Sequence, residues 1–448
     1  MTTRTSRRTF LGSAAAVAAA AAWTGNREAS AAEGASSSPG KTINIGLIGC
    51  GGEGRAVMAG HMRCPGTRVV AVCDLNEERL KLGVKATGND SVATYRDYRK
   101  LLEDKDIDAV IVATNDHWHC LCTINACQAG KHVYVEKPLG TSIGEGRAAV
   151  KAARKYNRIV QIGTQQHSWP HYQQAVEVIR SGRLGEISEV KVWDYDYLYP
   201  GFGSPPDSAP PKEFGEEYWD FWLGPSPKKP YNPNRFNHWY WFFDYAGAWQ
   251  VDWAVHHYDI VHMALGVTAP KSATASGGMF CFQDTNTEWP DTFSGICEYG
   301  PGPVAKKGFL LQYTFRSGCR REHRSHGKLF CGTEASLLLD RSGYTITPDI
   351  GKPGKEETVE NVFRGDAGHV DSLAAHAQVF LDSIRNDRRP PADVEQGHFA
   401  TNPGHLLNIA WKTGRKIRWD AEKEVIIDDE QANALVTKPY RAPWKLEV

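Results

Sequence analysis

The chain contains the stretch Ile43-Asn44-Ile45-Gly46-Leu47-Ile48-Gly49-Cys50-Gly51-Gly52-Glu53-Gly54, in which a short apolar run leads into the pattern G-x-G-x-x-G. A helical pattern follows, so the stretch predicts a strand, a tight turn and a helix. Glycines at this spacing let the backbone approach a pyrophosphate, which would lie at the helix N-terminus where N–H groups are free. The predicted contacts to a dinucleotide are Gly49, Gly51, Gly52 and Gly54.

A carboxylate that would select the cofactor follows at the end of the next predicted strand, Arg68–Cys73. Asp74 stands twenty residues after Gly54, where its side chain can accept hydrogen bonds from ribose hydroxyls. It would repel a 2′-phosphate, and Leu75-Asn76 offers no adjacent arginine, so we expect NAD rather than NADP. The alternative is a turn that binds no phosphate, with Asp74 capping a helix.

Strand and helix patterns alternate over the first part of the chain. Further apolar runs lie at Ala109–Ala113, His132–Val135 and Ile159–Ile162, with helical stretches between them. Apolar strands alternating with helices are typical of a parallel sheet covered on both faces. We therefore expect an α/β fold whose first domain, residues 41–163, is a doubly wound Rossmann domain.

The pattern changes after Gly163, where strands occur in runs and helices are grouped. This favours an α+β architecture. We expect residues 164–420 to form a substrate-binding domain with a large, mainly antiparallel, open sheet, and residues 421–448 to form a C-terminal extension. The expected elements include a strand over 187–199 and one helix over 252–265.

The first residues have the features of an export signal. Arg7-Arg8 precede an apolar, Ala-rich stretch, and Ala29-Ser30-Ala31 offers small residues that a signal peptidase accepts. We expect a twin-arginine signal peptide at residues 1–31, a flexible linker at 32–40, and a periplasmic or other extracytoplasmic mature protein. A basic amphipathic helix is the alternative, but a stretch of Ala and Val has no amphipathic face.

Composition narrows the function classes. The 448 residues include 52 Lys and Arg against 52 Asp and Glu, so the formal net charge is zero. The chain therefore lacks the excess of basic residues that is typical of proteins that bind nucleic acid. Beyond the N-terminus, no apolar run reaches the roughly 18 residues of a spanning helix, so we expect no integral membrane span in the mature chain. The ten cysteines include no C-x-x-C pair, and we expect no metal site.

Polar residues follow two strands at the carboxyl edge of the predicted sheet, where such folds bind ligands. Thr114, Asn115 and His119 come after the strand that ends at Ala113, and Lys137 comes between an apolar run and a proline. The lysine backbone is therefore extended, and an ammonium beside apolar walls has a readily tuned pKa. The first group could instead cap the next helix, and an isolated lysine of this kind is more often part of a solvated loop.

An acid and a histidine lie in the second domain. Asp252 and His256 stand four residues apart on the predicted helix, hence on one face. Placed against Lys137, they would give a substrate hydroxyl three candidate proton partners. By themselves, the two residues are more typical of a buried core histidine that pairs with an aspartate.

Together these motifs resemble the glucose–fructose oxidoreductase/inositol dehydrogenase/MocA family over nearly all of residues 43–420. The resemblance also includes the segments Trp219–Pro225, Glu288–Thr292 and Gly414–Asp420. The chain departs from the family pattern at three positions, where the family more often has Pro, Arg and Gly: Asn115, His167 and Ala254.

The resemblance assigns roles to individual residues. It implies that Lys137 binds both substrate and cofactor, and that Asp252 and His256 are the catalytic aspartate and histidine. It also implies that Glu136 and Gln165 lie beside the cofactor.

These expectations combine into an exported NAD(P)-dependent oxidoreductase that transfers a hydride between a sugar or polyol carbon and a tightly bound nicotinamide. His256 would take the hydroxyl proton, Asp252 would orient that histidine, and Lys137 would polarise the developing carbonyl oxygen. Export requires a retained cofactor, because free NAD is not reliably available outside the cytoplasm. Two alternatives stay open: an NAD-dependent glycoside hydrolase that acts by transient oxidation and elimination, and a non-catalytic NAD- and sugar-binding protein.

Half of the tryptophans, seven of 14, lie between Trp193 and Trp253. Flat aromatic faces stack on the C–H faces of sugars, so this cluster could bind a small carbohydrate substrate. A rigid core or an oligomer interface is an equal alternative. By resemblance we expect a homo-oligomer, either a dimer or a tetramer.

Overall fold

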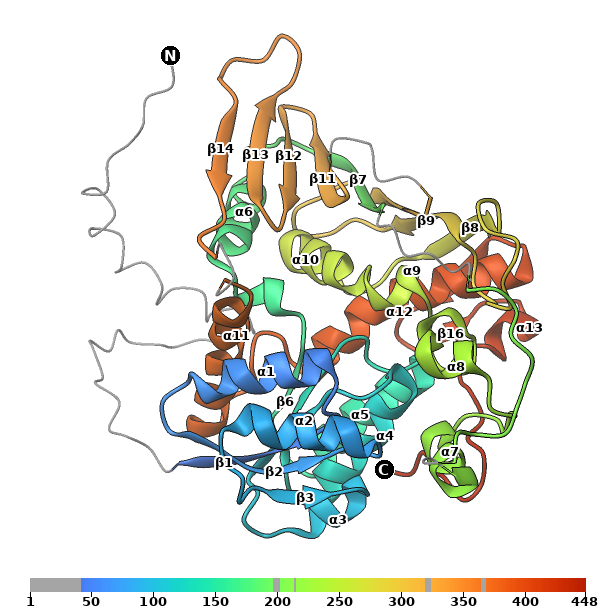
Figure 1. Ribbon diagram of the computed structural model, residues 1–448. Coiled ribbons are helices and arrows are strands. Elements are labelled where there is room, and N and C mark those ends of the chain that lie inside the picture. The colour runs from blue at the N-terminus through green and yellow to red at the C-terminus, as the bar shows by residue number, and fades with distance from the viewer. Residues whose placement is uncertain (1–41, 196–201, 213–214, 319–323, 364–367) are drawn as a thin grey trace. The chain divides into compact units, whose positions relative to one another are not determined.

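Two β-sheets organise the part of the chain that the structure, a computed structural model, describes: residues 42–195, 202–212, 215–318, 324–363 and 368–448 (Figure 1). The predicted signal peptide and linker lie outside the described residues. Residues 196–199, the end of the strand predicted over 187–199, also lie outside them. Within the described ranges, no helix is long and apolar enough to cross a membrane.

The first sheet is parallel throughout and has six strands in the order β3-β2-β1-β4-β5-β6. These are β1 (Ile43–Ile48), β2 (Thr67–Cys73), β3 (Ala93–Tyr95), β4 (Ala109–Val112), β5 (His132–Val135) and β6 (Val160–Ile162). The order reverses between β1 and β4, which places a ligand-binding crevice at their carboxyl ends. The predicted Rossmann fold is confirmed, and strands such as β4 are buried at every residue, as a sheet covered on both faces requires.

Helices cover both faces of this sheet. On one face, α3 (Tyr98–Glu103), α4 (Asp116–Gln128) and α5 (Ile143–Lys155) contribute to one apolar cluster. On the other face, α1 (Gly52–Met62) and α2 (Glu77–Thr87) are joined by α11 (Gly368–Arg385). Figure 1 shows α11 beside α1, and a Cβ added to Gly60 would lie only 2.9 Å from the Leu373 Cβ. A late segment of the chain therefore completes the cover of the first sheet.

The second sheet has ten strands in the order β14-β13-β12-β11-β7-β10-β9-β8-β15-β16. These are β7 (Ile187–Asp194), β8 (Ser272–Gly278), β9 (Thr292–Tyr299), β10 (Phe309–Arg316), β11 (His326–Gly332), β12 (Ala335–Asp340), β13 (Gly343–Pro348), β14 (Glu357–Glu360), β15 (Ile417–Asp420) and β16 (Val425–Ile426). The pair β7 and β10 is parallel, and the other described pairings are antiparallel. The predicted large, mainly antiparallel sheet is confirmed.

One face of the second sheet supports the core of its domain, where α6 (Pro170–Arg180), α10 (Val255–Leu265) and α12 (Val394–Thr413) pack against it. Along β10, Leu311 and Tyr313 are fully buried, whereas Leu310 is 44% exposed. This period of two is that of a strand with one covered face. The remaining elements are α7 (Gly215–Leu223), α8 (Pro233–Asn237), α9 (Trp249–Asp252), α13 (Glu430–Asn433) and the 3₁₀ helices η2 (Gln165–Ser168) and η3 (Trp239–Trp241).

The helix predicted over 252–265 is interrupted, which corrects the expectation of one continuous helix. It is divided into α9, which ends at Asp252, and α10. In a continuous helix the Asp252 carbonyl would accept the N–H of His256, but that N–H donates to the Trp253 carbonyl at 3.1 Å. The Asp252 carbonyl instead accepts from Lys137 Nζ, also at 3.1 Å. A long-range contact thus replaces a helical hydrogen bond.

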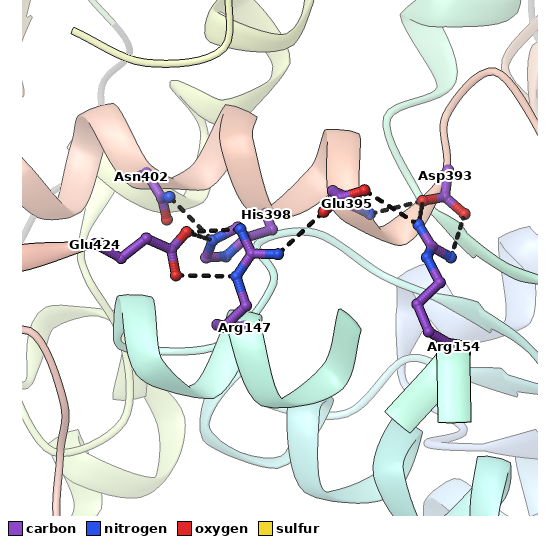
Figure 2. Close-up of polar contacts among 7 residues, drawn as sticks. All are labelled: Arg147, Arg154, Asp393, Glu395, His398, Asn402 and Glu424. Atoms are coloured by element: carbon purple, nitrogen blue, oxygen red, sulfur yellow. Dashed lines mark hydrogen bonds and ion pairs between the residues drawn. The ribbon is translucent and has the colours of Figure 1, made fainter. Parts of the chain in front are cut away.

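A polar cluster joins α5 of the first domain to α12: Arg147, Arg154, Asp393, Glu395, His398, Asn402 and Glu424 (Figure 2). Arg147 donates to Glu424 from Nε and Nη2, at 2.9 and 2.7 Å, and to Glu395 from Nη1 at 3.0 Å. The buried ring of His398 lies 2.6 Å from the same Glu424 carboxylate. Burial acts to raise the pKa of Glu424, but His398 and Arg147 outweigh it and lower the pKa to about 2.

We expect Glu424→Gln to lower the free energy of unfolding by about 1–3 kcal/mol at neutral pH, because Arg147 and His398 lose a charged partner. Since the fold lowers the pKa of Glu424 from 4.5 to about 2, its contribution is complete above the higher value and is lost as the pH falls through the lower. Urea unfolding at neutral pH and in acid measures both effects. The difference between variant and wild type should shrink in acid.

The matched control is Glu78→Gln, whose partner Lys81 lies 2.9 Å away on the surface of α2. Exposed pairs of this kind contribute little, so we expect a change within about 0.5 kcal/mol. Equal effects of the two substitutions, or an effect of Glu424→Gln that does not vary with pH, would contradict a stabilising role of this polar cluster.

Candidate active site

The glycine turn after β1 is shaped by its close approach to β4. Gly49 has φ +98°, and a Cβ there would lie 2.3 Å from the Ala113 carbonyl oxygen. A Cβ on Gly54 would lie 2.0 Å from the carbonyl oxygen of Gly49. At Gly51 and Gly52 an added Cβ would meet nothing within 4 Å. The fold itself therefore needs the first and last glycines, whereas the middle two leave room at the N-terminus of α1.

A cavity of about 490 Å³ lies along the carboxyl ends of β1, β2 and β4. The four glycines line it, together with Asp74, Thr114 and Asn115. Gly51, the N-cap residue of α1, has no side chain to occupy the free N–H groups of the first helical turn. Open space at such a helix end is the property of a phosphate-binding site.

Asp74 ends β2 at one side of the cavity. Its carboxylate accepts the N–H groups of Cys50 and Asn76, both at 2.8 Å, and burial raises its pKa. Arg79 and Arg96 also line the cavity. Sequence reasoning missed these two arginines because neither is adjacent to Asp74. The place of Arg79 in the first turn of the following helix is the signal that could have found it.

Thr114 and Asn115 line the cavity at the end of β4. His119 lies in α4, and its ring nitrogens are 2.8 and 3.1 Å from the carbonyl oxygens of Pro138 and Thr114. Burial lowers the pKa of this histidine to about 4. The ring is therefore neutral and has a single N–H, which donates to one of these two carbonyl oxygens.

Glu136 ends β5 with a buried carboxyl group. Its Oε2 accepts the N–H of Lys137 at 3.2 Å, while Oε1 has no partner among the described residues. Burial, followed by the nearby Glu53, raises the pKa of Glu136 to about 8. Gln165, at the start of η2 after β6, is buried as well. Both lie at the sheet edge where sequence analysis expected cofactor contacts.

Lys137 reaches from the first domain to the second. Its Nζ donates to Asp252 Oδ1 at 2.6 Å and to the Asp252 carbonyl at 3.1 Å. Desolvation opposes the charge, but Asp252 and then Glu136 outweigh it and raise the pKa of Lys137 to about 12. The lysine is therefore an ammonium at neutral pH, which suits a hydrogen-bond donor rather than a base.

His256 lies in the first turn of α10 and is buried, and its Nδ1 has no partner among the described residues. Desolvation, then the charges of Arg341 and Lys137, lower its pKa, so the ring is neutral and can accept a proton. In the described part of the chain no hydrogen bond joins His256 to Asp252. The expected orienting contact is absent there because Asp252, at the break between α9 and α10, pairs with Lys137 instead.

Asp116, which the sequence analysis did not single out as a site residue, is a further ionisable group near these residues. It begins α4 and is buried, and its Oδ2 has no partner in the described ranges. Burial and then Asp252 raise the pKa of Asp116, while Lys137 acts to lower it. Its place two residues after Thr114, at the same sheet edge, is the signal that could have found it.

The aromatic cluster between Trp193 and Trp253 is divided between core and cavity. Trp219 and Trp241 are buried in the core of the second domain, as the alternative of a rigid aromatic core predicts. Trp222 and Trp239 line the cavity. The ring of Trp253 lies beside that of His256, with centroids 5.8 Å apart.

The histidines and cysteines near the start of α4 have structural roles. His117 donates to the Trp222 carbonyl at 3.0 Å, and Cys120, Cys122 and Cys127 are buried thiols. Over the residues that the structure describes, no group of three or more His, Cys, Asp and Glu side chains is placed to hold a metal ion.

These features fit a dinucleotide. The free N–H groups of α1 and the open space at Gly51 and Gly52 would hold its pyrophosphate, and Asp74 would accept the hydroxyls of one ribose. The same sheet edge continues through β4 to Glu136 and Lys137 at the end of β5.

Two regions of the chain match models of a protein family. Residues 43–164 match the one described as "Oxidoreductase family, NAD-binding Rossmann fold". Residues 362–446 match the one described as "Oxidoreductase family, C-terminal alpha/beta domain". The second region includes α11, α12 and the C-terminal tail.

Curated relatives match over about a third of the chain. An inositol 2-dehydrogenase of Saccharopolyspora erythraea is 36% identical over 150 residues, which are 32% of this chain and 42% of the relative. A glycosyl hydrolase family 109 protein of the same organism is 28% identical over 155 residues, 33% of this chain and 34% of the relative. The chain therefore spans less than half the length of these relatives.

A solved structure shares the fold over a longer range. Levoglucosan dehydrogenase, in complex with NADH and levoglucosan, superposes with a TM-score of 0.65 and 16% sequence identity. The superposition covers 84% of this chain and 99% of the dehydrogenase.

We expect Gly52→Ala to keep the fold but to weaken NAD binding by about tenfold or more, a cost of at least about 1.4 kcal/mol. The added Cβ contacts no protein atom within 4 Å but occupies space that lines the cavity. Gly49→Ala should instead lower the melting temperature, because its Cβ would meet the Ala113 carbonyl. Thermal unfolding and calorimetric titration with NAD measure the two effects. Wild-type NAD affinity in Gly52→Ala would show that no pyrophosphate lies at this turn.

Proposed function

We propose that this chain is a dehydrogenase that transfers a hydride between a CH–OH carbon of a sugar or polyol and NAD. Both matched regions are those of the Gfo/Idh/MocA family of NAD-binding oxidoreductases, which supports the proposal. The observation that carries the proposal is the contact of Lys137 with Asp252, beside a buried, neutral His256 at the edge of the nucleotide-binding sheet. The inositol 2-dehydrogenase and levoglucosan dehydrogenase relatives support this substrate class.

NAD, when bound, supplies the nicotinamide carbon that accepts or returns the hydride. Asp252 uses two of the three donors of the Lys137 ammonium, which leaves one N–H for a substrate oxygen. That donor stabilises the negative charge that develops on the oxygen during oxidation. The Nδ1 atom of His256, which has no partner among the described residues, accepts the hydroxyl proton. Asp252 positions the lysine rather than the histidine.

We expect Lys137→Met to lower kcat by at least about 10²- to 10³-fold, the size of effect that follows loss of one such donor, while NAD binding persists. Steady-state rates on inositols and hexoses, with calorimetric titration of NAD, measure the two quantities. The control is Lys151→Met, which removes an exposed lysine of α5. Turnover by Lys137→Met at the wild-type rate would contradict the assignment.

We also propose that the cofactor is tightly bound, with helix α7 as its cover. Tyr218, Phe221 and Trp222 of α7 line the same cavity as the glycine turn, and Tyr218 interacts electrostatically with Asp74. A dinucleotide in this cavity would lie between the sheet edge and α7. Its release would therefore require displacement of a helix that belongs to the later part of the chain.

The C-terminal tail holds α7 in this position. Arg441 donates from Nη1 to Asp220 Oδ1 at 2.8 Å and from Nη2 to the Asp220 carbonyl at 3.0 Å. Trp444 packs on Phe221 of α7 and on Trp118 of α4, with ring centroids 5.5 and 4.9 Å apart. The tail thus connects α7 to the first domain, which supports slow release of a bound cofactor.

We expect Arg441→Ala to speed NAD dissociation by about tenfold or more, because affinity differences of this kind act mainly through the off-rate. Stopped-flow fluorescence of the loaded protein, and the nucleotide retained after gel filtration, measure the effect. Lys445→Ala is the control, since that lysine lies in the same tail and pairs with Glu447 on the surface. Equal dissociation rates for both variants would contradict a role of the tail in cofactor retention.

We propose in addition that the protein is exported by the twin-arginine route and is periplasmic or extracytoplasmic. The support is in the sequence: Arg7-Arg8 and the Ala-rich stretch that follows. A covered, retained NAD suits an enzyme that works where free NAD is scarce.

A homo-oligomer, either dimer or tetramer, is also proposed. Ile296 of β9 and Leu310 of β10 are 40% and 44% exposed on neighbouring strands of the second sheet. Apolar side chains on an open sheet face favour association of two sheets.

A second candidate function is NAD-dependent glycoside hydrolysis by transient oxidation, elimination and reduction. The observation that favours it is the match to a glycosyl hydrolase family 109 protein. Incubation with aryl glycosides and with free sugars separates the two functions. Release of the aglycone without net NADH would favour the hydrolase, whereas accumulation of a keto-sugar or lactone with NADH would favour the dehydrogenase.

A further inference from the structure

Arg341, in the turn between β12 and β13, forms no ion pair with an acidic side chain among the described residues, and the buried Asp194 interacts with it only at longer range. Its Nε is buried and has no hydrogen-bond partner in those ranges. The neighbouring Arg324, in contrast, pairs with Asp340 at 2.5 Å. A guanidinium that is partly desolvated and unpaired is costly to keep. Such a group is typical of a site that receives an anion.

The guanidinium of Arg341 faces the proposed reaction centre. Its central carbon lies 4.6 Å from the ring centroid of Trp253 and 6.0 Å from that of Trp169. Trp253 directly follows Asp252, and its ring contacts the ring of His256 at 5.8 Å. The indole of Trp253 thus contacts both the Arg341 guanidinium and the ring of the proton-accepting histidine.

Local contacts fix the position of Arg341. Its carbonyl oxygen accepts from Asn361 Nδ2 at 2.9 Å, which holds the turn, and the indole of Trp253 holds the guanidinium from one side. The second nearby cation, Lys328, is fully buried and donates to Gln166 Oε1 at 3.2 Å. Arg341 keeps part of its surface open. Of these two cations, it is therefore the one that a ligand can reach.

We propose that Arg341 binds a carboxylate of the substrate, so that the enzyme acts on sugar acids such as hexuronates in preference to neutral sugars. The proposal rests on the proposed dehydrogenase function and specifies its substrate class. A planar guanidinium against an indole face presents its edge, which matches a carboxylate through two parallel hydrogen bonds. One accessible cation fits one negative charge. A phosphate dianion is usually met by several donors.

The test uses the full chain loaded with NAD and three matched pairs of sugars: the uronate and the neutral hexose of gluco, galacto and manno configuration. We expect the wild type to have a higher kcat/KM for the acid of at least one pair. In Arg341→Gln the ratio of acid to neutral kcat/KM should fall by about 10- to 100-fold, as expected for loss of a charge-assisted pair. The control Arg324→Gln, in which the lost charge was already paired, should keep the wild-type ratio.

A second readout separates this proposal from the dehydrogenase function. Calorimetric titration of the same uronates, and of hexose 6-phosphates, measures binding without turnover. If no sugar is oxidised but a uronate binds in an Arg341-dependent way, the dehydrogenase function fails and the carboxylate site stands. If neutral hexoses are oxidised and no uronate is preferred or bound, the carboxylate site fails alone. Equal losses on acid and neutral sugars in Arg341→Gln, or tighter binding of the phosphates, would also overturn it.

Discussion

The contact between the Lys137 ammonium and Asp252 is the interaction on which the rest of the site depends. The Lys137 Nζ donates to the Asp252 carbonyl as well as to its carboxylate, at the residue where α9 ends before α10 begins at Val255. The break gives His256 a backbone bond to Trp253 and leaves its ring available. One ammonium therefore connects the two domains at the break between α9 and α10. The Asp252 carboxylate that it contacts in turn stabilises the charged form of the lysine.

The late part of the chain returns repeatedly to the first domain. Helix α11 packs beside α1, α12 contacts α5 through the Arg147 and Glu395 pair, and the tail holds α7 beside α4. Each of these contacts joins segments more than 100 residues apart. Residues that would meet the cofactor and residues that would meet the substrate are therefore positioned by the same set of contacts.

Local sequence pattern was sufficient for the strands and the glycine turn, and less so for the helices. The apolar run at Ile43–Ile48 has the same bounds in the sequence prediction and in the structure. The helix predicted over 252–265 is divided in two, and the long helix α12 contains Pro403 in its interior. A proline normally marks a helix boundary, but here it is buried together with its neighbours, and tertiary packing outweighs the local penalty.

The sequence by itself determined that a strand, a glycine turn and a helix follow one another from Ile43 onward, because spacing and glycine content act on adjacent residues. It also placed Lys137, Asp252 and His256 among the candidates. Only the tertiary structure decided that Asp252 pairs with Lys137 rather than with His256. The two partners stand 115 residues apart, and a local helical pattern contains no information about which distant donor will reach a carbonyl. For the same reason the position of Arg341 beside Trp253, with no ion pair among the described residues, is visible only once the sheet of the second domain has formed.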